Sequence, residues 1–262
     1  MQLTVDELRS AIRALYGRKV EESDLWYPYC FASHNAFGAI ERARAMGYSE
    51  AELSGVPPEA VMGLGCGNPL SLLEIRPGDT VLDLGSGGGM DVLLASARIG
   101  PEGKGIGLDI TEEMVRKAHR TAAFYRCRNV EFRSGEMENL PFEAESVDAV
   151  MSNFAVSLSP DKPRVFREVF RVLKPGGRLA VCELAYAGVK PGAVEGGTEA
   201  GLWYAAGPLA PEGYARLLAE SGFKAVEIVW ERDFEMDGGG DSVRAVSIGI
   251  RAQKPAFGKG DP

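Results

Sequence analysis

Short apolar runs alternate with amphipathic stretches through the middle of the chain. Apolar runs predict strands at 81–84, 105–109, 130–133, 146–151 and up to residue 183, and helical spacing predicts helices at 114–126 and 163–173. This alternation is typical of an α/β domain with a parallel sheet and right-handed crossovers. Two last runs, at 223–230 and 245–251, predict an antiparallel pair that closes the sheet.

The chain divides into four parts on the same pattern. A capping box at Thr4/Glu7 starts a helix expected over residues 5–16, a second helix is expected at 36–46, and a capping box at Ser49/Glu52 starts a third. These elements predict a helical arm over residues 1–62. The alternating core follows at 63–186. Glycines and prolines from 187 to 209 predict a lid. The lid belongs to a third part, 187–222, which ends in a helix, and the fourth part, 223–262, holds the last strands and a tail.

The stretch VLDLGSGGGMD, residues 81–91, predicts a strand, a tight turn and a helix start. Glycines let the backbone adopt positive φ and approach a ligand closely. The amide groups at the start of the next helix favour a polar or anionic group, so we expect a nucleotide-like ligand. The NAD fingerprint G-x-G-x-x-G fits poorly, because Met90 stands where its third glycine belongs.

Polar residues follow four of the predicted strands. Asp83 and Asp109 end two strands, and Asp109 stands where a ribose-binding acid belongs. Gly135-Glu136-Met137 and Ser152-Asn153 follow two more strands. Ligands of open α/β sheets bind outside the carboxyl ends of the strands, so these positions predict one crevice.

Composition narrows the partners. The 262 residues are 45% hydrophobic and carry a net charge of −8 with no basic cluster, which argues against a nucleic-acid surface. No apolar run approaches the roughly 20 residues that span a bilayer, and the acidic N-terminus is unlike a signal peptide. The four cysteines form no C-x-x-C pair or zinc spacing, so we expect no metal and a reducing cytoplasm. We also expect a small-molecule substrate, and the oligomeric state stays open.

The motifs DLGSGGG, GLDI, GEMENLP, VDAVMSN and RVLKPGGRLAV together resemble the class I S-adenosylmethionine-dependent methyltransferases. The resemblance implies a doubly wound, Rossmann-like α/β fold with a seven-stranded sheet, and S-adenosylmethionine as cofactor. It implies that the glycine loop holds the methionine moiety, that Asp109 binds the ribose, and that the residues after Asp109 lie near the adenine. The implied cofactor residues are Asp83, Gly85, Ser86, Gly87, Gly89, Asp109, Ile110, Met114, Gly135, Glu136, Met137 and Asn153.

A narrower resemblance comes from GLGCGNPL, SNFAVSLSPDK and VFREVFRVLKPGG, which are similar to the arsenite methyltransferases. In that family cysteine thiolates hold trivalent arsenic, as soft ligands suit a soft centre. Cys66 matches the cysteine of GCGNP, where flanking glycines predict an accessible thiol, and Cys30 lies in the arm where the family carries another. The two other family positions hold Phe154 and Tyr204 here.

Aromatic residues cannot bind arsenic covalently but can stack on an organic ring. We therefore predict a methyltransferase for a small organic acceptor, with an arsenite or methylarsenite methyltransferase that uses Cys30 and Cys66 as the alternative. A cofactor-binding protein without turnover is a third possibility. If the acceptor must lose a proton, His34 and Glu183 are the candidate bases, because histidine titrates near neutrality and Glu183 ends the fifth strand.

Overall fold

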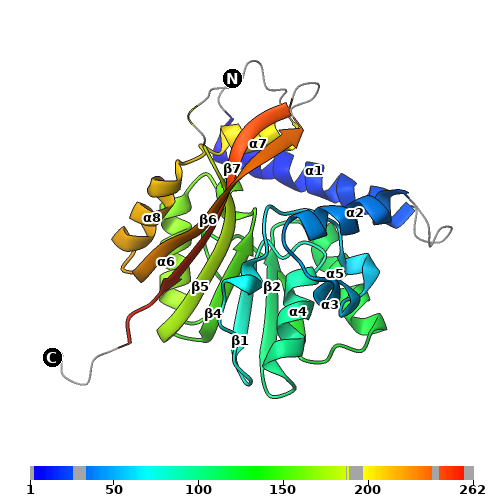
Figure 1. Ribbon diagram of the computed structural model, residues 1–262, viewed down its shortest axis with the longest axis horizontal. Coiled ribbons are helices and arrows are strands. Elements are labelled where there is room, and N and C mark those ends of the chain that lie inside the picture. The colour runs from blue at the N-terminus through cyan, green and yellow to red at the C-terminus, as the bar shows by residue number, and fades with distance from the viewer. Residues whose placement is uncertain (1–2, 26–33, 187, 189–196, 238–241, 257–262) are drawn as a thin grey trace.

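A computed structural model describes residues 3–25, 34–186, 188, 197–237 and 242–256 (Figure 1). Its centre is a seven-stranded sheet in the order β3-β2-β1-β4-β5-β7-β6, in which β1 to β5 are parallel and β7 is antiparallel to both its neighbours. The strands are Thr80–Leu84 (β1), Lys104–Asp109 (β2), Val130–Ser134 (β3), Val147–Asn153 (β4), Leu173–Ala185 (β5), Lys224–Asp237 (β6) and Ser242–Gln253 (β7). The sheet confirms the predicted fold.

Helices cover both faces of the sheet, as a doubly wound fold requires. The α-helices are Val5–Leu25 (α1), His34–Ala45 (α2), Glu50–Ser54 (α3), Met90–Ile99 (α4), Glu112–Phe124 (α5), Lys162–Val172 (α6), Glu199–Ala205 (α7) and Pro211–Glu220 (α8). Alternate residues of β1 explain this arrangement, since Leu82 packs in a core with α6 and α8 while Val81 packs in a second core with α4 and α5. Both faces of the central strand are therefore buried.

The N-terminal arm starts where its capping box predicts. The backbone N–H of Thr4 donates to Glu7 Oε2 at 2.8 Å, and the N–H of Glu7 donates to Thr4 Oγ1 at 3.3 Å. The helix continues to Leu25, well past the predicted end at Tyr16. Ser49 and Glu52 form the second predicted capping box, at the start of α3.

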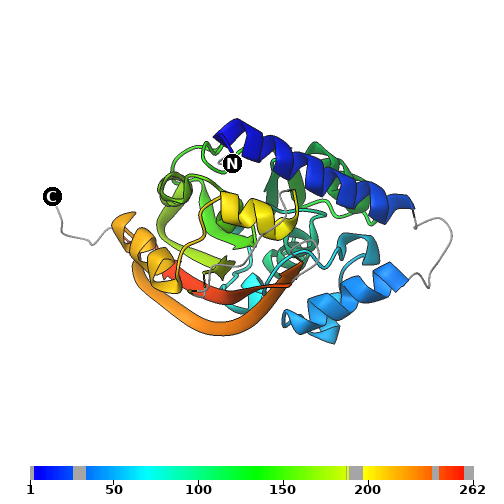
Figure 2. The same ribbon diagram turned by 90° about the horizontal axis from the view of Figure 1, so that it is seen from above.

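Two helices, α1 and α7, lie side by side across one end of the sheet, and we call them the cover (Figure 2). They come from opposite ends of the sequence. The predicted lid, residues 187–209, contributes α7 to this cover; residues 187 and 189–196 lie outside the described part, as does most of the aromatic stretch 24–31 with Cys30.

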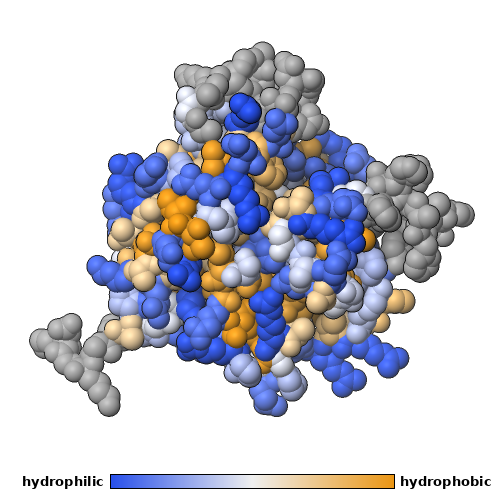
Figure 3. Space-filling view, viewed as in Figure 1, coloured by the Kyte–Doolittle hydropathy of each residue, from blue (hydrophilic) through white to orange (hydrophobic). Residues whose placement is uncertain are grey.

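The face shown in Figure 3 is largely hydrophilic, with smaller hydrophobic patches between the charged groups. In the described residues, no helix combines the length and the apolar character that crossing a membrane requires. At one edge of the sheet, β6 pairs only with β7 within the described chain.

Candidate active site

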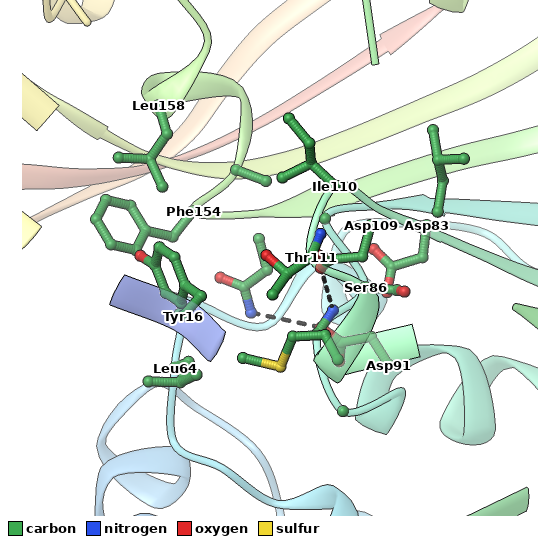
Figure 4. Close-up of a pocket in the computed structure, with 18 of the residues that line it drawn as sticks. Tyr16, Leu64, Asp83, Ser86, Asp91, Asp109, Ile110, Thr111, Phe154 and Leu158 are labelled. Atoms are coloured by element: carbon green, nitrogen blue, oxygen red, sulfur yellow. Dashed lines mark hydrogen bonds between the residues drawn. The ribbon is translucent and has the colours of Figure 1, made fainter. Parts of the chain in front are cut away.

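A pocket opens at the carboxyl ends of the parallel strands, beneath the cover (Figure 4). The glycine loop between β1 and α4 forms its floor. Gly85, Gly87 and Gly89 have φ of 71°, 51° and 89°, a region that glycine adopts without strain. A Cβ at Gly85 would lie 2.2 Å from Ala155 Cβ, whereas a Cβ at Gly87 would meet nothing nearer than Met114 Sδ at 4.0 Å. Gly87 thus faces open space in the pocket.

Asp109, at the end of β2, lines the pocket beside this loop. One of its carboxylate oxygens accepts the N–H of Gly87 and the other accepts the N–H of Thr111, both at 2.8 Å. Burial raises the pKa of Asp109, and these backbone donors oppose the rise. A carboxylate held in this way keeps unused lone pairs for ligand hydroxyls, as the predicted ribose contact requires.

Two further carboxylates, Asp83 and Asp91, line the pocket, and neither forms an ion pair with a lysine or arginine of the described residues. Asp91 accepts hydrogen bonds from Tyr48 Oη at 2.6 Å and from Asn153 Nδ2 at 3.4 Å. Asp83 is 2% exposed and its Oδ1 has no hydrogen-bond partner among the described residues. Burial and the neighbouring Asp91 charge raise the pKa of Asp83 well above its usual range, and burial raises that of Asp91 to about 6. Such a pair favours a ligand that brings a positive charge.

The rest of the predicted cofactor set divides in two. Ser86, Ile110, Met114, Gly135 and Met137 line the pocket and give it an apolar side. The other predicted residues, Gly89 and Glu136, do not line it. Gly89 is the N-cap of α4, and Glu136 reaches outward to pair with Arg9 at 3.2 Å and Arg13 at 3.4 Å.

Tyr16, Phe154 and Leu158 lie together at one end of the pocket, and Asp83 and Asp91 lie at the other (Figure 4). Phe154 is 8% exposed and has a φ of 57°, which is uncommon for a residue with a side chain. Its ring faces this end of the pocket. This end of the pocket is therefore lined by aromatic and aliphatic side chains.

Sequence reasoning missed the contribution of α1, which lines the pocket with Arg9, Ile12 and Tyr16. Ile12 and Tyr16 are four residues apart and so share one face of the helix. That spacing predicts a buried face. It does not indicate which part of the core the face covers, because nothing local links residue 16 to residue 154.

The prediction that Glu183 faces the crevice is wrong. Glu183 is fully buried and does not line the pocket. Its carboxylate accepts hydrogen bonds from Ser152 Oγ at 3.1 Å and from the N–H groups of Val156 and Ser157 at 3.0 and 2.9 Å. It fixes the short 3₁₀ helix Val156–Leu158 and has no free path to a substrate.

Asn153 lines the pocket, but its amide group is occupied. Its Oδ1 accepts the N–H of Cys66 at 2.9 Å, and its Nδ2 donates to the carbonyl of Gly67 at 2.8 Å and to Tyr48 Oη at 3.1 Å. These bonds give Asn153 a positioning role, and its contact with the cofactor stays a prediction. Asn153 holds the loop that carries Cys66.

The candidate substrate residues do not gather around the pocket. Cys66 is buried rather than accessible, because Gly65 abuts Asn153 and Gly67 abuts Cys182. Tyr204 packs edge-on against Trp203 with ring centroids 4.9 Å apart, away from the pocket lining. Among the members of the substrate set that the structure describes, only Phe154 lines the pocket. Cys30 and the side chain of His34 lie outside the described residues, and in the described chain no group of three or more His, Cys, Asp or Glu could hold a metal.

Comparison with known proteins decides the family. A family described as a methyltransferase domain matches residues 75–206, just over half of the chain. The chain belongs to this family. The match confirms the predicted class of S-adenosylmethionine-dependent methyltransferase and its cofactor.

Individual relatives point in a narrower direction. The chain is 40% identical over 222 residues to an arsenite methyltransferase of Halobacterium salinarum. The matched region covers 80% of the chain and 56% of that relative. It is 39% identical over 109 residues to a demethylmenaquinone methyltransferase of Lactococcus lactis. That match covers 42% of the chain and 43% of the relative. The chain thus spans only about half the length of these relatives.

Among solved structures, the chain is similar to an arsenic (III) S-adenosylmethionine methyltransferase from Chlamydomonas reinhardtii. The TM-score is 0.61 with 28% sequence identity, over 84% of this chain and 74% of that one. A geranyl diphosphate methyltransferase in complex with GPP and sinefungin matches with a TM-score of 0.56 and 21% identity, over 71% and 76% of the two chains. The second likeness extends to the fold alone.

Proposed function

We propose that this chain transfers the methyl group of S-adenosylmethionine to a small organic acceptor held by Tyr16, Phe154 and Leu158. One observation carries the proposal: this end of the pocket is lined by aromatic and aliphatic side chains, and no thiol of the described residues lines it. Phe154 stands where the similar arsenite methyltransferases carry a cysteine. Its ring favours stacking on an organic group.

The residues of the other end fit the cofactor. The oxygen of Asp83 that lacks a partner and the buried carboxylate of Asp91 suit the positively charged methionine part of S-adenosylmethionine. Gly87 leaves room for close approach, and Asp109 suits ribose hydroxyls. When bound, the cofactor supplies a methyl group attached to a sulfonium. The sulfur leaves as a neutral thioether, so no acid is needed to help it leave.

Catalysis by this chain then rests on orientation. The cover keeps water from the pocket, and the aromatic end aligns the acceptor with the methyl group; such alignment can supply roughly 7–11 kcal/mol of barrier reduction. Since Glu183 is sealed by three hydrogen bonds, it serves the fold rather than proton transfer.

An arsenical acceptor is the second candidate, and one observation favours it. Cys66 belongs to the same buried cluster as Phe154 and Cys182, so a thiol stands directly behind the aromatic end of the pocket. Methylarsenite would need two thiolates. Cys66 and Cys30 stand at family-like positions and could supply them. The three described cysteines are free, which agrees with the reducing cytoplasm as the proposed compartment.

The test is a methyl-transfer screen that includes phenols, thiols, arsenite and methylarsenite, with formation of S-adenosylhomocysteine as the readout. We expect turnover of an organic acceptor that persists in Cys66→Ser and in the control Cys127→Ser. Turnover of an arsenical alone, lost in Cys66→Ser but kept in Cys127→Ser, would replace the organic acceptor by the second candidate. If S-adenosylmethionine raises the melting temperature but no acceptor is methylated, the chain binds its cofactor without turnover.

A further inference from the structure

A buried lysine stands next to the pocket without lining it. Lys162 begins α6 and is 3% exposed, and its Nζ donates to the carbonyls of Ser159 and Ala206, both at 2.8 Å. Burial and the positive end of a helix both disfavour an ammonium group. Burial lowers the pKa of Lys162 to about 8, while the nearby carboxylates of Glu183 and Glu138 oppose this effect. A lysine in so unfavourable a place calls for a role.

The two carbonyls belong to different parts of the molecule. Ser159 lines the pocket, and its hydroxyl donates to Glu138 at 2.5 Å. Ala206 is the C-cap of α7, where helix carbonyls lack intrahelical partners and carry the negative end of the helix dipole. The ammonium group of Lys162 therefore joins the pocket wall to the C-terminal end of the cover helix α7.

The other end of α7 reaches the pocket through Glu199. Its Oε1 accepts a hydrogen bond from Tyr16 Oη at 3.2 Å and pairs with Lys19 Nζ at 3.1 Å. The Tyr16 ring lies next to Phe154 in the pocket (Figure 4). A seven-residue helix has little stability of its own, so its tertiary contacts decide where it lies.

We propose that Lys162 is a positioning residue that fixes α7 and, through Glu199, holds Tyr16 against the occupied pocket. Hydrogen bonds join Lys162 to Ser159 and Ala206 at one end of α7, and Glu199 to Tyr16 at the other, so the helix itself connects the two sets of contacts. The inference rests on the proposed function only in that the pocket binds S-adenosylmethionine.

A matched control exists at the opposite end of the sheet. Lys254 is also buried, at 7% exposure, and its Nζ donates at 2.7 Å to the carbonyl of Leu173, the C-cap of α6. Lys162→Met and Lys254→Met each remove one buried lysine that caps a helix. We expect both to lower the melting temperature. We expect only Lys162→Met to raise the Kd for S-adenosylmethionine, by about tenfold, and to speed amide hydrogen exchange in residues 199–206.

Glu199→Gln tests the same connection from the other end and keeps the proposal falsifiable if Lys162→Met fails to fold. We expect it to weaken S-adenosylmethionine binding, and the double variant to lose no more affinity than the weaker-binding single variant, because both act through α7. Unchanged affinity and exchange in either folded variant, or fully additive losses, would overturn the proposal. If the parent binds no S-adenosylmethionine, the proposed function fails, whereas the exchange of residues 199–206 still tests Lys162.

Discussion

The two ends of the parallel sheet treat their carboxylates in opposite ways. At the amino end, Asp79 pairs with Arg178 at 2.7 Å and Asp148 pairs with Lys174 at 2.8 Å. At the carboxyl end, four residues further along the chain from Asp79, Asp83 has an oxygen with no hydrogen-bond partner among the described residues. Among the same residues, no lysine or arginine forms an ion pair with Asp91.

This difference separates stability from function within one strand and its neighbours. A buried carboxylate without a cation destabilises the folded chain, and a ligand that brings a positive charge offsets this cost. Paired carboxylates at the amino end hold strands together and need no ligand. Variants made in matched pairs, one at each end, should therefore change different quantities.

The largest effect is expected for Gly87→Val. Valine at a positive φ is strained, and its side chain would fill the open space beside Gly87, where the nearest atom outside the loop is Met114 Sδ at 4.0 Å. We expect S-adenosylmethionine affinity to fall about a hundredfold or more, roughly 3 kcal/mol, in calorimetry. The control is Gly78→Val, at a φ of 86° with open space at the amino end, which should lose stability but keep affinity. Equal affinities in both variants would place the cofactor elsewhere.

A smaller loss is expected for Asp109→Ala. The change removes the carboxylate that suits the ribose and also releases the N–H of Gly87 that it orients. We expect the binding free energy of S-adenosylmethionine to weaken by roughly 1.5–3 kcal/mol. Asp148 is the matched residue, since it accepts the N–H of Thr80 at 2.9 Å and pairs with Lys174. Asp148→Ala should lower the melting temperature only; normal affinity in Asp109→Ala would contradict the assignment.

The smallest effect, and one of opposite sign, is expected for Asp83→Asn. The pKa of Asp83 is raised in the folded protein, so the charged form is penalised at neutral pH and the penalty disappears below about pH 4, where the carboxyl is protonated in both states. We expect Asp83→Asn to raise the free energy of unfolding of the ligand-free chain by roughly 1 kcal/mol at pH 7, with no gain near pH 4. Denaturant titrations at the two pH values measure this.

Asp79→Asn provides the contrast, because it leaves the Arg178 guanidinium half-paired in a site where that side chain is 12% exposed. It should destabilise the chain at pH 7. Destabilisation by both changes would mean that Asp83 has a structural partner, and the comparison between the ends would fail.

Local patterns were enough to predict most of the fold and the floor of the pocket. The glycine loop, Asp83 and Asp109 are contiguous with the strands that place them, so the strand pattern also locates the site. The cover could not be located in the same way. Tyr16 reaches the pocket only because a helix longer than its pattern crosses the sheet, which depends on tertiary packing.

The predictions for Glu183 and Cys66 were wrong for a different reason, which concerns the direction of side chains and the use of glycine. Successive residues of a strand point to opposite faces, so the position of Glu183 at a strand end does not decide whether it meets the crevice or the core. The glycines beside Cys66 predict access for a ligand. In the structure they give room to Asn153 and Cys182 instead, since protein atoms as well as ligands can require close approach.

The edge strand β6 has a consequence for how copies of this chain meet. A long edge strand offers unpaired backbone groups to any other strand, which invites self-association. Along β6 four exposed positions are acidic, Glu227, Glu231, Asp233 and Glu235, against two exposed basic positions, Lys224 and Arg232. Two copies aligned edge to edge would bring these like charges together, so the acidic row opposes sheet-to-sheet aggregation at neutral pH and loses that protection as the carboxylates protonate.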